Sequence, residues 1–218
     1  MHNTFTRGLL PVAGLLAAGI LAGCGSSGSS GSSKTANAAD RAFVAEMIPH
    51  HKLAVQMAQM AQMQGIHPQI KTLASSITAT QNREISEMSG VAGQIGAQVD
   101  DQAASGQMHM GAMMSTNAQT LGISMDKMGM SMNMTKLASA RPFDREFIDM
   151  MSPHHQGAIT MAKAELAKGT DPKLKALAQS IISDQTREIG QMSSWRIKWY
   201  GGPVPPAAAA GAGGMQGM

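Results

Sequence analysis

The sequence predicts an all-α fold, a four-helix bundle built from two similar antiparallel helical hairpins. Three observations predict it: an internal repeat, apolar residues at helical spacing within each copy, and a composition poor in strand-forming residues. Aromatic residues make up 3% of the 218-residue chain, whereas methionine occurs 21 times. Because strands favour aromatic and β-branched residues, this composition favours helices.

The internal repeat covers residues 43–92 and 147–196. The tripeptide Pro-His-His at 49–51 returns at 153–155, and the shift of 104 residues is kept throughout both copies. No insertion interrupts either copy, so the two copies are expected to fold alike.

Within each copy, apolar residues recur at alternating steps of four and three positions, the spacing of one face of an amphipathic helix. In the first copy this face runs from Phe43 to Ala61, Gly65 and Pro68 mark a turn, and a second helix follows from about Ile70. Each hairpin has one apolar face to bury. Two hairpins packed together therefore form a bundle of the usual size for one domain.

Pro49 and Pro153 come directly before the two histidine pairs. Inside a helix, a proline removes one backbone hydrogen bond at a cost of about 3 kcal/mol. Each histidine pair is therefore expected at a helix kink or at the start of a new helix.

Residues 1–23 have the pattern of a secretory signal peptide, with one early basic residue, a short apolar run and then Leu21-Ala22-Gly23-Cys24. The apolar run is too short to span a bilayer, which takes about 20 residues. Small residues followed by cysteine resemble the lipobox of bacterial lipoproteins. This resemblance implies acylation of Cys24, and hence an extracytoplasmic protein anchored to the cell membrane.

The remaining segments complete the expected domain organisation. Residues 24–39 are a Gly/Ser-rich tether, residues 40–200 the bundle domain, and residues 201–218 a Pro/Ala/Gly tail expected to be disordered. A methionine-rich linker, 93–141, connects the two copies and is too long for a simple turn. A formal charge of +3 without a basic block argues against nucleic-acid binding.

The histidine pairs and the polar residues opposite them are candidate metal ligands. In the first hairpin, His50 lies nearly as far from the turn as Gln81 and Glu84, so the three should meet at one height of the bundle. The second hairpin repeats the arrangement. Adjacent helical residues point about 100° apart, so we expect the first histidine of each pair in this cluster and the second at its edge. The candidate ligands are His50, His51, His154, His155, Gln81, Gln185, Glu84 and Glu188.

Methionine thioethers form a second set of candidate ligands. The four linker methionines alternate with other residues, so an extended strand would place them all on one side. The alternative is an amphipathic segment that lies across the bundle. With Cys24 acylated, no thiolate remains, and a Met/His set favours Cu(I), or Ag(I), over hard cations. The candidate thioether ligands are Met47, Met151, Met57, Met161, Met88 and Met192 in the repeats and Met128, Met130, Met132 and Met134 in the linker.

Two motifs carry a resemblance to a known family. Phe-x-x-x-Met-x-Pro-His-His-x-x-Ala-x-x-Met-Ala occurs at 43–58 and 147–162, and Gln-x-Arg-Glu-Ile-x-x-Met occurs at 81–88 and 185–192. Together they resemble the domain of unknown function 305 family. The resemblance implies a ferritin-like bundle and, because that family includes CopM-type extracytoplasmic proteins, copper binding.

Three functions are open at this point. The first is a copper-binding protein that sequesters the ion or delivers it to a partner protein. This function would explain why the candidate ligands are soft and include no thiols. A ferritin-like di-iron or copper oxidase would normally supply Glu-x-x-His pairs, but Glu46 stands four residues before His50 and Asp149 five before His154. A metal-free envelope interaction module would use the polar residues to fix helix register. We predict the copper-binding protein, without catalytic residues and with iron less expected than copper.

Overall fold

The computed structural model describes residues 36–100 and 110–206, and all regular structure within these ranges is helical. None of the described helices is long and apolar enough to cross a bilayer. The predicted signal peptide, Cys24, most of the tether and the end of the tail lie outside the described residues.

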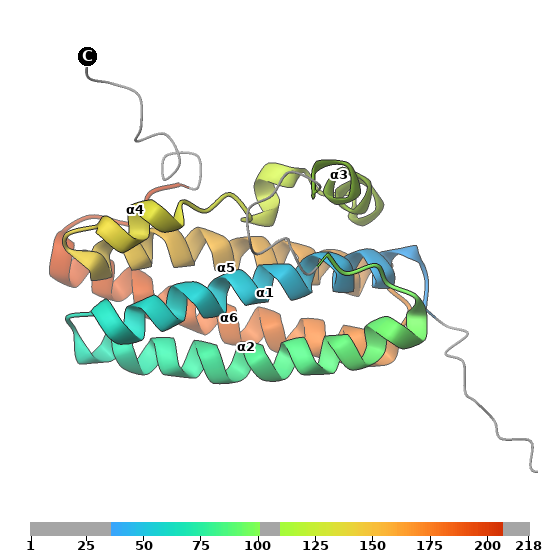
Figure 1. The fold of residues 1–218 in the computed structure, drawn as a ribbon, viewed down its shortest axis with the longest axis horizontal. Helices are drawn as coiled ribbons and strands as arrows, with labels where there is room; N and C mark the ends of the chain where they lie inside the picture. The colour runs from blue at the N-terminus through green and yellow to red at the C-terminus, as the bar shows by residue number, and fades with distance from the viewer. Residues whose placement is uncertain (1–35, 101–109, 207–218) are drawn as a thin grey trace, which may run out of the picture. The chain divides into compact units, whose positions relative to one another are not determined.

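Four long helices form two hairpins (Figure 1). Helix α1 (Ala38–Gln64) packs against α2 (Pro68–Ile95), and α5 (Phe143–Lys168) packs against α6 (Pro172–Tyr200). The hairpins meet mainly through α1 and α5, whereas α2 and α6 scarcely touch. The predicted fold class, an all-α four-helix bundle of two duplicated hairpins, is confirmed.

The helix boundaries follow from local chemistry. Helix α1 ends at Gly65, whose N–H donates to the carbonyl of Ala61 at 2.9 Å, and Pro68 occupies the first turn of α2, where a missing N–H removes no helical hydrogen bond. Pro49 and Pro153, in contrast, lie inside continuous helices. No new helix starts at either proline, so that alternative of the sequence prediction is wrong.

Two equivalent aspartates connect the hairpins, and the sequence analysis did not identify them. Asp40 accepts the backbone N–H groups of residues 170–171 at 3.0 and 2.9 Å, and Asp144 accepts those of residues 66–67 at 2.9 and 2.8 Å. Both side chains are 0% exposed. Because the first turn of each inner helix is bonded to the turn of the other hairpin, α1 and α5 run antiparallel.

Two apolar clusters fill the bundle, with a polar layer between them. In α1, one cluster ends at Ile48 and the other begins at Ala54; in α5, the gap lies between Met151 and Ala158. Both histidine pairs fall in these gaps. We call the polar residues at this level the histidine layer; they are His50, His51, Gln81, Glu84, His154, His155, Gln185 and Glu188.

The methionine-rich linker is helical in part, which corrects the expectation of an extended strand. It contains α3 (Met110–Leu121), a 3-10 helix η2 (Met125–Met128) and α4 (Met134–Ser139). Met128 is fully buried; Met130 packs against one apolar cluster, and Met132 and Met134 against the other. The segment with these four methionines therefore lies across the bundle as an amphipathic segment, which is the alternative to the extended strand.

The linker crosses α5 at Gly157. A β-carbon added to Gly157 would lie 2.2 Å from the carbonyl oxygen of Met128, so only glycine allows so close an approach. Gly129, with a positive φ of 70°, follows in the linker and lies against the backbone of His154. The first copy has Leu53 at the position of Gly157, so the crossing is specific to the second hairpin.

Glu165 is a buried acidic residue near the end of α5. Its side chain is 0% exposed and lies beside the carboxyl of Asp40. Burial, and then the neighbouring carboxyl of Asp40, raises the pKa of Glu165 to about 8. Glu165 is therefore mostly protonated in the folded protein at neutral pH.

The free energy of unfolding should consequently fall as the pH rises from 7 to 9. Unfolded, Glu165 has an ordinary pKa of 4.5 and is already ionised, so only the folded state loses this proton, and stability declines by about 1.5 kcal/mol. Glu165→Gln has no such proton and should lack this part of the decline. Urea denaturation of both proteins at pH 7, 8 and 9 measures the difference, and parallel pH profiles would contradict the assignment.

Candidate metal centre

The two histidine pairs form one buried cluster between the hairpins. Helix α1 supplies His50 and His51, helix α5 supplies His154 and His155, and none is more than 1% exposed. The rings of His50 and His154 are stacked across the α1–α5 interface, with centroids 3.6 Å apart and planes 4° from parallel. The pairs are thus brought together by the packing of one hairpin on the other.

The second histidine of each pair, not the first, meets the glutamate of its own hairpin. His51 Nε2 lies 2.9 Å from Glu84 Oε2, and His155 Nε2 lies 2.7 Å from Glu188 Oε2. The predicted height of these glutamates was right, but the assignment of the first histidine to the cluster with them was wrong. The physical reason is that adjacent residues of a helix point about 100° apart. When the second histidine faces its own hairpin, the first faces the other hairpin, and counting residues from the turn of one hairpin does not take the other hairpin into account.

The glutamates fix the orientation of two imidazoles. A carboxylate only accepts hydrogen bonds, so Nε2 of His51 and of His155 carries the hydrogen, and Nδ1 of the neutral ring carries the lone pair. Neither Nδ1 atom has a hydrogen-bond partner within the described part of the chain. A histidine held by a carboxylate on one nitrogen and open on the other is the usual arrangement of a metal-binding histidine.

Unpaired polar atoms are concentrated in the histidine layer. A buried polar atom without a partner costs about 1 to 3 kcal/mol, so a layer with several of them fits a polar guest such as a metal ion. The layer atoms that find no hydrogen-bond partner in residues 36–100 and 110–206 are His50 Nδ1 and Nε2, His51 Nδ1, Gln81 Oε1, His155 Nδ1, and Gln185 Oε1 and Nε2.

Burial also keeps the stacked histidines neutral. Desolvation, followed by the repulsion that a second protonated ring at His154 would cause, holds the pKa of His50 well below its ordinary value, and desolvation lowers the pKa of His154 to about 3. A metal ion therefore has no proton to displace from these rings at neutral pH.

His154 cannot satisfy both of its neighbours. Its Nδ1 lies 2.6 Å from the carbonyl oxygen of Gly129, and its Nε2 lies 3.0 Å from the carbonyl oxygen of His50. A neutral imidazole has one N–H, so one nitrogen directs its lone pair at an oxygen. A cation near that nitrogen would relieve the repulsion.

The repeat methionines lie in the two apolar clusters on either side of the histidine layer, and all six are fully buried. Each methionine in one cluster has its repeat counterpart in the other cluster. The two clusters therefore offer equivalent groups of thioethers to the histidine layer. One cluster contains Met47, Met88 and Met161, and the other contains Met57, Met151 and Met192.

No ready-made site of hard ligands exists in the part of the chain that the structure describes. Nowhere in it do three His, Cys, Asp or Glu side chains converge so that they could hold a metal ion. The histidine layer presents pairs instead, and a third ligand would have to be a thioether, an amide oxygen or a rotated imidazole.

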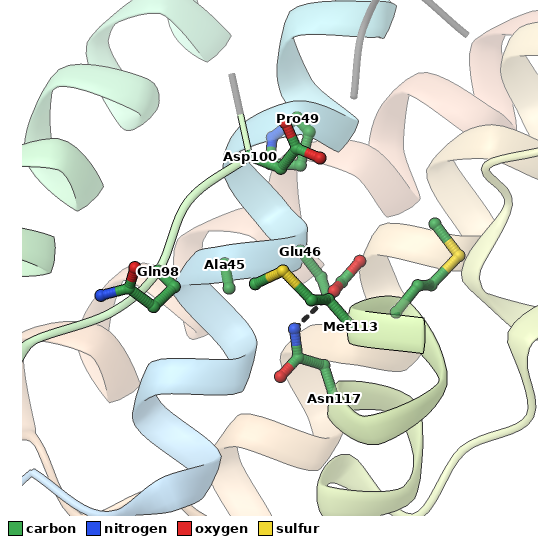
Figure 2. A pocket seen from close by; sticks show the side chains of 8 residues that line it. Ala45, Glu46, Pro49, Gln98, Asp100, Met113 and Asn117 are labelled. Carbon is green, nitrogen blue, oxygen red and sulfur yellow. Dashed lines mark hydrogen bonds between the residues drawn. The ribbon is translucent and has the colours of Figure 1, made fainter. Parts of the chain in front are cut away.

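Two carboxylates close to the histidines in sequence lie outside the layer. Glu46 Oε1 accepts a hydrogen bond from Asn117 Nδ2 at 2.7 Å (Figure 2). Asp149 Oδ1 accepts one from Arg196 Nε at 2.7 Å, in a buried ion pair. The counterpart of Asp149 is Ala45, so this pair belongs to the second hairpin alone.

Comparison with known proteins identifies the family. The model of the family described as "Domain of unknown function (DUF305)" matches residues 40–196. The chain belongs to the DUF305 family. The family resemblance predicted from the two motifs is thus confirmed.

Solved structures of DUF305 proteins share the fold. CopM in the Cu(II)-bound form is 37% identical, with a TM-score of 0.60 over 74% of this chain and 97% of that chain. CopM in the Cu(I)-bound form is 34% identical, with a TM-score of 0.59 over 74% and 98%. A DUF305 fragment from Deinococcus radiodurans, 23% identical with a TM-score of 0.60 over 75% and 99%, supports the fold alone.

A shorter match links this DUF305 chain to a viral protein. It is 43% identical over 51 residues to "Uncharacterized protein L153" of Acanthamoeba polyphaga mimivirus. The match covers 23% of this chain and 34% of that protein, so the chain spans about a third of that relative.

Proposed function

We propose that this protein is an extracytoplasmic copper-binding protein that sequesters the ion or delivers it to a partner, and that the histidine layer holds the ion. The observation that carries the proposal is the set of buried imidazole nitrogens, on His50, His51 and His155, that have no hydrogen-bond partner among the residues that the structure describes. Further support comes from CopM, which was crystallised in Cu(I)-, Cu(II)- and Ag-bound forms.

The ligand chemistry favours a soft ion. Imidazole nitrogen and thioether sulfur are the donors that the layer and the two flanking clusters offer, and without thiolates this set favours Cu(I) or Ag(I). In this proposal Glu84 and Glu188 are hydrogen-bond acceptors that orient His51 and His155 rather than ligands, because each carboxylate already receives an Nε2–H.

Anchoring to the membrane is part of the proposal. Cys24 follows small residues and a short apolar run, and acylation there would hold the bundle outside the cytoplasm through the Gly/Ser-rich segment that follows. Recovery of the mature protein in the soluble fraction of disrupted cells would contradict the anchor without affecting the metal site.

Replacing the stacked pair, in His50→Leu with His154→Leu, should abolish tight Cu(I) binding because it removes two nitrogen donors at the centre of the layer. Leucine keeps most of the buried volume and offers no lone pair. The measurement is competition for Cu(I) between the protein and a chromophoric chelator under reducing conditions. His67→Gln is the matched control, because His67 is one-third exposed and lies outside the layer, beside Asp144.

Two results would count against the histidine layer. One is wild-type Cu(I) affinity in a folded variant that lacks all four histidines, together with X-ray absorption that shows sulfur neighbours alone. The other is no withdrawal of Cu(I) from the chelator by the wild-type protein, which would favour the metal-free interaction module.

A further inference from the structure

A small cavity lies one helical turn before His50 on α1, where α3 covers that helix (Figure 2). Pro49, the residue before His50, forms part of its wall, so the cavity lies next to the histidine layer along α1. Its volume of about 20 Å³ admits one guest of the size of a water molecule or an ion, not an organic ligand. The lining residues are Ala45, Glu46, Pro49, Gln98, Asp100, Met113, Met114 and Asn117.

Glu46 is a carboxylate at a position that the second copy fills with an apolar side chain. Its counterpart is Met150, which is 3% exposed, and Glu46 itself is only 5% exposed. Glu46 Oε1 accepts a hydrogen bond from Asn117 Nδ2 at 2.7 Å. A buried carboxylate is costly unless a positive charge accompanies it, and the described residues that line this cavity include no Lys or Arg.

Thioethers from the linker line the cavity together with the polar side chains of Gln98, Asp100 and Asn117. Met113 is 45% exposed and Met114 is 8% exposed, so one methionine is open to solvent and the next is covered. Figure 2 shows Met113 and Asn117 on α3, facing Glu46 on α1. A carboxylate beside thioethers attracts a cation by charge and selects a soft one by ligand type.

We propose that Glu46, Met113 and Met114 form a second, outer site that takes one Cu(I) or Ag(I) ion from solvent before the ion reaches the histidine layer. The final location of the ion, in the histidine layer, rests on the proposed function. The outer site itself depends only on these three side chains. Its physical role is kinetic: negative charge and an exposed thioether at the mouth raise the rate of capture, whereas the buried nitrogens set the final affinity.

The test uses the full protein, with Cu(I) supplied on a chelator and uptake followed by stopped flow. Glu46→Gln and Met113→Leu should each slow uptake about tenfold, a change typical of lost electrostatic or ligand capture, with final affinity nearly unchanged. Glu46→Gln keeps an oxygen that accepts from Asn117, and thermal unfolding verifies that the variants fold. Met63→Leu is the matched control because Met63 is a 73% exposed thioether elsewhere on α1.

Counting bound ions gives a second measurement. Equilibrium dialysis with Ag(I) should find one ion fewer in the double variant Glu46→Gln with Met113→Leu, and an ion retained in the His50→Leu, His154→Leu protein. Wild-type uptake rate and wild-type Ag(I) content in the double variant would overturn the outer site while the histidine layer stands. Loss of all Ag(I) in the histidine variant would likewise overturn it.

Discussion

Gly157→Ala should lower the free energy of unfolding by about 3 kcal/mol, the upper range for overpacking a buried contact. The added β-carbon would lie 2.2 Å from the Met128 oxygen, 2.4 Å from its carbonyl carbon and 2.7 Å from the Gly129 nitrogen. These are backbone atoms that no rotamer change can move away. The linker must therefore shift off α5, and His154 loses the Gly129 carbonyl that now lies 2.6 Å from its Nδ1.

The same substitution elsewhere provides the control for Gly157. Gly90 and Gly190 lie inside α2 and α6, and a β-carbon at either would meet nothing within 4 Å. Alanine there should stabilise the protein by about 0.5 to 1 kcal/mol, because alanine favours helices over glycine. Urea denaturation compares the three variants, and equal effects of one sign would contradict the close crossing of linker and helix.

Asp144→Ala should destabilise the protein by about 3 kcal/mol, since hydrogen bonds to a buried charged group are worth about 1.5 to 3 kcal/mol and the donors left behind lose their partner. The carboxylate is 0% exposed, accepts the N–H groups of Ile66 and His67, and lies 2.7 Å from His67 Nδ1. Chemical denaturation measures the loss. Asp126→Ala, at an exposed position in η2, should change stability by less than about 0.5 kcal/mol.

An unchanged denaturation midpoint for Asp144→Ala would show that the link between the hairpins contributes little. Faster hydrogen exchange at residues 66–67 alone, with the global free energy of unfolding unchanged, would also contradict the prediction, because the loss of stability would then be confined to the turn. The expected result is instead a lower midpoint with an unchanged slope, because both hairpins should still unfold together.

Much of the bundle could be predicted from the sequence because the repeat and the helical spacing are local signals. Gly65 and Pro68 are residues that break helices, and the structure places the turn between α1 and α2 at these residues, as predicted. Equal distances from that turn also placed Glu84 at the height of the histidines. Height follows from rise per residue, which is nearly constant in any α-helix.

The rotation of each histidine could not be predicted in the same way. Whether His50 faces α2 or α5 depends on where the second hairpin packs, and nothing within one hairpin specifies that. The contacts of Asp40 and Asp144 were missed for the same reason, since each joins positions far apart in sequence. Packing between hairpins therefore determines the details of the candidate site.

Differences between the copies held a signal that the sequence analysis did not use. Gly157 in the second copy corresponds to Leu53 in the first, and Glu46 in the first copy corresponds to Met150 in the second. In a duplicated fold, such exchanges mark positions where one half contacts something that the other half lacks. Here that partner is the linker, which crosses α5 at Gly157 and covers α1 beside Glu46.

The reciprocal aspartate contacts have a consequence for how this architecture could originate. Each hairpin carries both parts of the interaction, an acid at its beginning and, at its bend, N–H groups that donate to the acid of the other hairpin. Two identical hairpins could therefore close on one another around a twofold axis with every such contact made. Fusion of the two members of a symmetric homodimer into one polypeptide would produce this arrangement, and the connecting segment would then be free to diverge into a cover for one side only.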